Sequence, residues 1–119
     1  MPIFASLISL DTATSKDKDT VQLCEQCIWA VGNICGDGPA MRDLATREGL
    51  PQKFSELLEL VGEPGGKVFA ERPALLRNLA WSSSNLFRGK PKPAYSAEMS
   101  RLARALARLV GLPDDEVRG

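Results

Sequence analysis

The sequence lacks histidine altogether and is sparing with cysteine. Of its 119 residues none is histidine and only 3 are cysteine. The absence of histidine removes the commonest general base and zinc ligand. The cysteine count is odd, and no basic residue precedes the apolar N-terminal stretch as it would in a signal peptide. Together these features indicate reduced thiols.

Excess charge and long apolar runs are missing as well. Lysine plus arginine number 15 and aspartate plus glutamate number 15, so the formal net charge is zero. No overall field therefore draws the chain to nucleic acid or to a membrane surface, and no apolar run approaches a membrane span. No nucleophile–base pair, phosphate-binding loop or metal cluster can be assembled. The sequence thus predicts no enzyme, no cofactor, no nucleic-acid partner and no membrane partner.

What the sequence does contain is a repeated tryptophan–asparagine pair. The stretch "CEQCIWAVGNICGDG" (24–38) holds Trp29 and Asn33, and "LRNLAWSSSNLFRGK" (76–90) holds Trp81 and Asn85. A second type of segment, "IFASLISL", "KFSELLEL" and "LARALARL", alternates with these stretches at a period of roughly 50 residues. Two alternating segment types predict an α-solenoid.

Apolar residues at three-and-four spacing predict that every unit is helical. Helices are expected at about 20–35, 40–48, 52–61, 74–87 and 96–110, with a short one near the N-terminus and a loop over 62–73. No alternation of period two is long enough to predict a strand. The chain begins and ends inside a repeat, so we expect one segment, 1–119, of about two to three repeats truncated at both ends. Ser82 to Ser84 could be phosphorylated, but small residues that allow close helix contact are the preferred interpretation.

Two longer stretches carry a family resemblance. "QLCEQCIWAVGNICGDGPAMRDL" (22–44) and "LLRNLAWSSSNLFRGKPKP" (75–93) resemble the central armadillo repeats of importin-α (karyopherin-α), the nuclear import adaptor. The resemblance implies an all-α, right-handed armadillo-repeat solenoid that works in cytoplasm and nucleus. Its long third helices would line a concave groove for the basic nuclear localisation signals of cargo. The family also implies importin-β as a partner, although the basic segment that binds importin-β is absent here.

The tryptophan–asparagine pairs suit such a groove. Neighbouring helices pack roughly 8–10 Å apart and an extended peptide advances ~3.3–3.6 Å per residue, so one repeat spans two or three peptide residues. An asparagine amide both donates and accepts, so Asn33 and Asn85 are predicted to hold the peptide backbone. Trp29 and Trp81 are predicted to form walls along which lysine or arginine stems lie, with cation–π attraction of roughly 0.5–2 kcal/mol per contact.

Four further residues complete the predicted site. Asp37, two turns beyond Trp29, is expected to meet a lysine charge, as the resemblance also implies, or else to act as a capping residue. Asn78 lies one turn before Trp81 and is predicted to add a backbone contact, with Gln26 as its counterpart in the first repeat. Arg88, one turn after Asn85, would hold a carboxylate or a peptide carbonyl.

Three alternatives stay open on sequence alone. Each tryptophan–asparagine pair could reflect packing, with a half-buried indole and an exposed amide. The chain could be a degenerate armadillo scaffold that binds another protein without any transport activity. Finally, Cys24 and Cys27 form a CxxC motif, so a thiol or metal function has to be weighed. Their apolar neighbours favour buried, inert thiols.

Overall fold

The computed structural model describes residues 6–61, 67–88 and 96–110, and every regular element in these ranges is a helix. In chain order they are α2 (Leu10–Ala13), α3 (Lys18–Gly36), α4 (Pro39–Arg47), α5 (Leu50–Leu58), α6 (Lys67–Glu71), α7 (Pro73–Asn85) and α8 (Ala97–Val110). The expected all-α class is therefore confirmed for these residues. No described helix has both the length and the apolar character that a membrane crossing requires.

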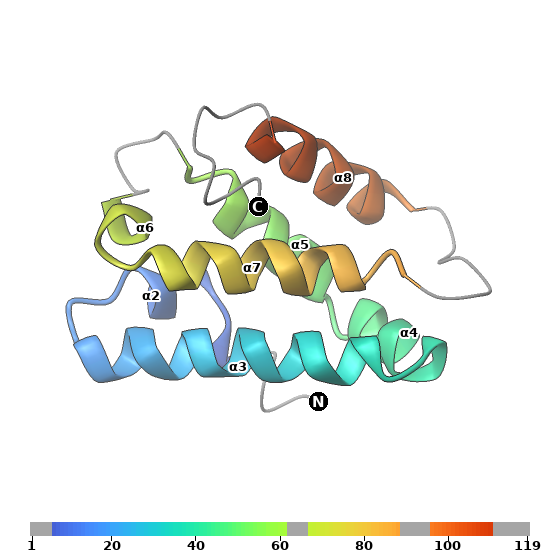
Figure 1. The fold of residues 1–119 in the computed structure, drawn as a ribbon, viewed down its shortest axis with the longest axis horizontal. Helices are drawn as coiled ribbons and strands as arrows, with labels where there is room; N and C mark the ends of the chain where they lie inside the picture. Colours follow the sequence, from blue (N-terminus) through green and yellow to red (C-terminus); the bar gives the residue numbers. More distant parts are fainter. Residues whose placement is uncertain (1–5, 62–66, 89–95, 111–119) are drawn as a thin grey trace.

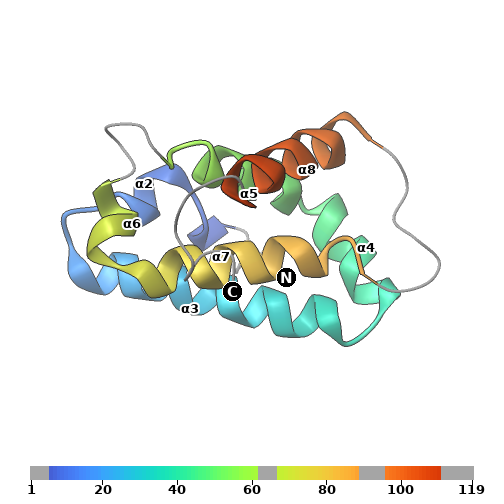
Figure 2. The same cartoon turned by 45° about the horizontal axis from the view of Figure 1, so that its top comes forward.

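Helices that occupy equivalent places in the repeat lie side by side. Figure 1 shows α3 and α7 side by side and running in the same direction, and α5 and α8 paired in the same way. Figure 2 shows these two pairs as two layers, with α4 leading from the end of α3 to the start of α5. Such stacking of equivalent helices is the arrangement that alternating repeats predict.

The core lies between the two layers. It is built from the apolar stripes of the helices: Val21, Cys24, Ile28, Val31, Phe54, Leu57, Leu75, Leu79, Leu102 and Ala105 are among its buried members. The stripe expected on the first long helix is thus confirmed, because residues at three-and-four spacing share one face. The other face of α3 is left toward solvent.

Proline and glycine set the boundaries of the short helices. Pro39, Pro51 and Pro73 stand in the first turns of α4, α5 and α7, where the missing N–H has no intrahelical partner to lose. Gly49 separates α4 from α5 with a φ of 83°. That left-handed conformation is one that residues with a Cβ rarely adopt.

One sequence expectation differs from the structure. The loop predicted over 62–73 contains α6, because Phe69 packs into the core at 6% exposure and holds one helical turn in place. Near the N-terminus, where the sequence predicts a short helix, α2 begins at Leu10. There the Ser9 side chain accepts the backbone N–H of Thr12, and the Thr12 hydroxyl bonds back to the Ser9 N–H, a capping box that starts a helix. The expectation that the chain ends inside a repeat falls on residues 111–119, which lie outside the described residues.

Candidate peptide-binding face

The exposed side of α3 carries a row of polar and aromatic residues. Trp29 is 53% exposed, and Gln26, Asn33 and Asp37 are exposed as well. Their three- and four-residue spacing places them on one side of the helix. Asp37 is the C-cap residue of α3, and its backbone N–H donates to the carbonyl of Ile34. All four predicted residues of the first repeat therefore lie where a ligand can reach them.

The corresponding residues of α7 are less uniform. Trp81 is 38% exposed and Asn78 is half-buried. Asn85 is only 1% exposed, and its Nδ2 donates to the backbone carbonyl of Gly32 at 2.9 Å. The structure thus differs from the expectation that Asn85 faces a peptide as Asn33 does. Its amide donor is already used to join α7 to α3.

Arg88 lies just beyond α7 and is tied to the fold. Its Nη1 donates to Oδ1 of Asn85 at 3.3 Å, and its carbonyl accepts Nη1 of Arg42 at 2.7 Å. Arg42 itself is 1% exposed and forms an ion pair with Asp43. Arg88 is nevertheless exposed, so its predicted contact with a ligand carboxylate stays a prediction, while its Nη1 bonds to Asn85.

A very close approach of α7 to α3 sets the position of Trp81. A Cβ added to Gly32 would lie 2.4 Å from both the Ser82 Oγ and the Trp81 ring, which is closer than real atoms come. The Ser82 hydroxyl donates to the carbonyl of Ile28 at 2.6 Å. The preferred interpretation of the serine run, small residues for helix contact, is confirmed at Ser82. The indole of Trp81 lies over the bare backbone of Gly32, between the two helices.

A shallow hollow of about 230 Å³ opens beside Trp29. It is lined by Glu25, Gln26, Trp29 and Asn78, and so by residues of both helices. Glu25 supplies the only carboxylate among these residues, and sequence reasoning missed it. The signal was present, because Glu25 stands one turn before Trp29 and residues four apart share a helix face. Asp37 does not line this hollow and lies two turns beyond Trp29, toward the other end of α3.

Glu25 already has a cationic partner. Its Oε2 accepts Nη2 of Arg72 at 2.5 Å and Nε at 3.2 Å. The two side chains are 16% and 31% exposed, respectively, so water still reaches the pair. A second cation that enters the hollow would meet a carboxylate that is shared with Arg72.

The three cysteines are buried and unpaired. Burial raises the pKa of Cys24 and of Cys27, and it raises the pKa of Cys35 to about 11. A raised pKa keeps a thiol protonated and a poor nucleophile. Among the described residues, no group of three or more potential ligands could hold a metal ion. The CxxC motif thus serves as part of the core.

Comparison with known proteins agrees with the stacked-helix architecture. No protein-family model matches the chain. Importin subunit alpha-1b of rice is 36% identical over 98% of this chain, and importin subunit alpha-2 of Arabidopsis thaliana is 35% identical over 98%. Probable importin subunit alpha-A of Dictyostelium discoideum is 34% identical over 97%. The chain spans 18%, 18% and 21% of the lengths of these three relatives.

The fold and the relatives together define the class of protein. Equivalent helices stacked in two layers make this a helical repeat protein. The chain belongs to the importin-α family of armadillo-repeat proteins.

Proposed function

We propose that this chain binds basic, lysine-rich peptides across α3 and α7, as a segment of a nuclear import adaptor. The observation that carries the proposal is the exposure of two tryptophans, Trp29 at 53% and Trp81 at 38%, on neighbouring helices that run in the same direction. Large aromatic side chains held in water beside polar groups are typical of sites that bind partners. The names of the relatives support the transport role.

The two indoles suit the aliphatic stems of long cationic side chains. A lysine can lie along an indole and keep its ammonium group at the edge, in water. The attraction of the ammonium to the ring face adds about 0.5–1 kcal/mol at an exposed site. Because Trp29 and Trp81 come from neighbouring helices, a peptide that crosses α3 and α7 contacts both of them.

Carboxylates flank the proposed path on both sides. Glu25 stands one turn before Trp29, and Asp37 stands one turn after Asn33. Side chains of an extended peptide alternate between its two sides. A lysine on one side would then reach Glu25, and a lysine on the other side would reach Asp37. This arrangement favours peptides that carry several cations over peptides that carry one.

The amides are given different roles. Asn33 is exposed and free to pair with the N–H and C=O of a peptide backbone. Gln26 and Asn78 line the hollow beside Trp29 and are proposed as further contacts. Asn85 and Arg88 are proposed as positioning residues that hold α7 against α3 and keep Trp81 in place.

The wider role follows from family membership and is part of the proposal. Cargo proteins with basic localisation signals are the proposed partners, and importin-β is the proposed partner for transport. Movement between cytoplasm and nucleus belongs to the same proposal. Each of these expectations depends on the longer proteins to which the chain is related.

Fluorescence anisotropy with a labelled lysine-rich peptide tests the proposal. Asn33→Ala and Trp29→Ala should each weaken binding roughly tenfold or more, since each removes a central contact. Gln22→Ala, at an exposed position earlier on α3, is the matched control and should bind as the parent does. Circular dichroism confirms that all variants are helical. A helical parent that ignores the peptide would favour the scaffold without transport activity.

A further inference from the structure

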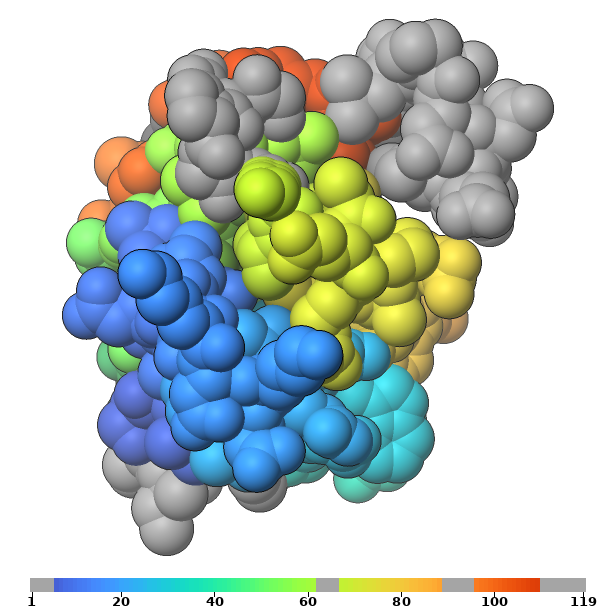
Figure 3. Space-filling view, turned by 90° about the vertical axis from the view of Figure 1, so that its left-hand side faces the viewer, coloured from blue at the N-terminus to red at the C-terminus, as the bar shows by residue number. Residues whose placement is uncertain are grey.

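A second hollow lies at the side of the molecule, away from the tryptophans. It has a volume of about 920 Å³ and lies between the connection from α2 to α3 and the short helix α6. Figure 3 shows this side of the molecule, where the blue segment around α2 and the start of α3 lies next to α6. Lys67, Val68 and Glu71 of α6 line one side of the hollow.

The lining of this hollow is mainly cationic. Lys16 and Lys18 come from the α2–α3 side, Lys67 and Arg72 come from the α6 side, and Glu71 is the one acid among the lining residues. The nearby Asp17 caps α3, where its side chain accepts the N–H of Asp19 and the hydroxyl of Thr20. Four cations stand against one carboxylate among the lining residues, while Glu25 pairs with Arg72, and Asp17 and Asp19 flank Lys18.

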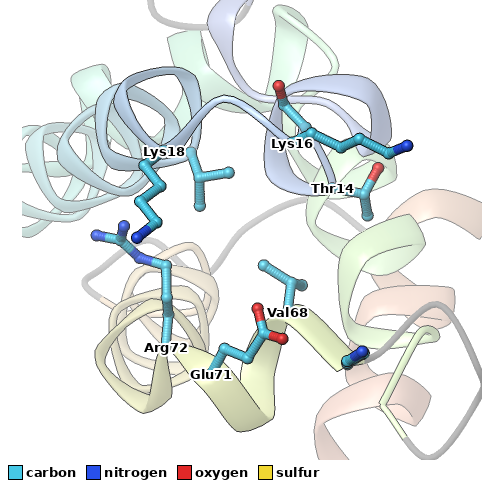
Figure 4. Close-up of a pocket in the computed structure, with 9 residues that line it drawn as sticks. Thr14, Lys16, Lys18, Val68, Glu71 and Arg72 are labelled. Carbon is cyan, nitrogen blue, oxygen red and sulfur yellow. The ribbon is translucent and has the colours of Figure 1, made fainter.

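Two of the cations face each other. Figure 4 shows the side chains of Lys18 and Arg72 pointing toward one another across one end of the hollow, while Lys16 points away from them. The carboxylate of Glu71 points inward near Val68 in the same view. Facing cations repel each other unless an anion lies nearby. Glu25 already compensates Arg72 here, so an anion bound between Arg72 and Lys18 would share Arg72 with that carboxylate. An arginine fork beside a lysine is the combination that binds phosphate oxygens.

We propose that this hollow binds a phosphate monoester group, with Lys18 and Arg72 as its principal contacts and Lys67 as a further cation. The group could belong to a small phosphorylated molecule or to a phosphorylated side chain of a peptide. The two sources share the same chemistry at this site. A phosphate carries two negative charges or nearly so and can therefore satisfy two facing cations, whereas a single carboxylate cannot.

Arg72 connects this hollow with the tryptophans. The same guanidinium that lines the hollow holds Glu25 at 2.5 Å, and Glu25 lines the hollow beside Trp29. A bound phosphate competes for Arg72 and leaves Glu25 freer to meet a lysine. Phosphate and basic peptide should therefore strengthen each other's binding, and equally in both directions. This coupling rests on the proposed peptide-binding function, whereas the phosphate site itself does not.

Calorimetric titration of the whole chain with inorganic phosphate tests the site, with chloride at matched ionic strength as the reference. Lys18→Gln/Lys67→Gln should weaken phosphate binding roughly tenfold. Arg47→Gln/Arg104→Gln removes two exposed cations elsewhere, on α4 and α8, and should leave binding unchanged. Equal losses in both variants, or phosphate binding no better than chloride, would overturn the proposal.

The source of the phosphate is distinguished by its carrier. Glycerol phosphate and a phosphoserine peptide are titrated in parallel with the unphosphorylated peptide. Tighter binding of the phosphopeptide than of glycerol phosphate assigns the site to a phosphorylated side chain, and the reverse assigns it to a small molecule. Binding of the unphosphorylated peptide as tightly as the phosphorylated one would contradict a phosphate site.

The coupling is measured by repeating the lysine-peptide titration at saturating phosphate and constant ionic strength. Peptide affinity should rise about fivefold, the lower end of usual coupling, because the pair between Glu25 and Arg72 is partly exposed. Glu25→Gln should abolish the rise and keep phosphate binding. An unchanged peptide affinity would refute the coupling. A chain that binds phosphate but never the peptide would refute the proposed function and leave the phosphate site standing.

Discussion

Asn33 and Asn85 stand at the same place in the repeated pair and have different surroundings. Asn33 is exposed, whereas Asn85 is 1% exposed and bonded to the carbonyl of Gly32. The cause is the neighbouring helix, because α3 lies against α7 on the side where Asn85 points. Among the described residues, no helix flanks α3 in the corresponding way. The repeated pair is visible in sequence, but the partner of each amide is not.

Cys35 shows how burial changes a single group. Burial raises its pKa to about 11, although Arg42 acts in the opposite direction. A thiol in an unfolded chain has a pKa of about 8.5. The folded state therefore binds the Cys35 proton more tightly, and this contribution to stability is complete below about pH 8.5 and is lost as the pH rises toward 11.

We expect this loss to be specific to the thiol. Urea unfolding of the parent and of Cys35→Ala is compared between about pH 8 and pH 11. The variant is less stable at pH 8, because a buried group is lost, but the difference should shrink as the pH rises. Contributions that are the same in both proteins cancel in this comparison. A constant difference across the range would show that Cys35 does not gain a proton on folding.

At the scale of the element, the contact between α3 and α7 decides the shape of the candidate site. Gly32 lets the backbone of α3 approach Trp81 and Ser82, and the Ser82 hydroxyl and the Asn85 amide then bond to carbonyls of α3. The small residues of α7, Ser82 to Ser84, are visible in the sequence. That a glycine on the other helix would face them required the packing itself, since helix propensity alone argues against glycine in a helix interior.

Substitution of two glycines of α3 separates this packing from helix propensity. Gly32→Ala should lower the free energy of unfolding by about 1–3 kcal/mol, because its methyl group overlaps Ser82 and Trp81. Gly36→Ala is the control, since its Cβ meets only the Asn85 amide at 3.5 Å. It should be neutral or stabilising by up to about 1 kcal/mol.

Denaturant unfolding and the position of the tryptophan emission band measure both variants. A shifted emission in Gly32→Ala, together with weaker binding of the lysine-rich peptide, would tie the displacement of Trp81 to the site. Equal stability of the two variants would contradict the close approach of the helices.

At the scale of the whole molecule, arginines tie together segments that are distant in sequence. Arg42 on α4 donates to the carbonyl of Arg88 beyond α7, and Arg101 on α8 pairs with Glu59 just after α5. Arg42 is 1% exposed, whereas the side chains of Arg101 and Glu59 are 37% and 36% exposed. The contact of Arg42 should therefore stabilise the fold more than the pair of Arg101 and Glu59, because water weakens exposed pairs.

Arg42→Gln should lower the free energy of unfolding by about 1.5–3 kcal/mol, the usual contribution of a buried hydrogen bond from a charged donor. Arg101→Gln should cost only about 0.2–1 kcal/mol. Hydrogen bonding from Arg101 lowers the pKa of Glu59, so this smaller contribution is lost as the pH falls through that lowered pKa. Thermal and urea unfolding of the parent and the two variants, at pH 7 and at pH 3, measure the two losses of stability and their change with pH. A larger cost for Arg101→Gln than for Arg42→Gln would refute the ranking.

The sequence by itself determined the helices and their order. Apolar spacing and prolines at first turns predicted the all-α class and the five main helices, and the repeated pair marked Trp29 and Trp81 as candidates. These features depend on residues that are close together along the chain. Tertiary structure alone decided the rest. Glu25 is a candidate because it lines a hollow together with Asn78 of α7. Asn85 is buried because its amide bonds to the Gly32 carbonyl. The short helix α6 is held in place by Phe69, which packs into the core. Each of these depends on contacts between segments far apart in sequence, which local pattern does not encode.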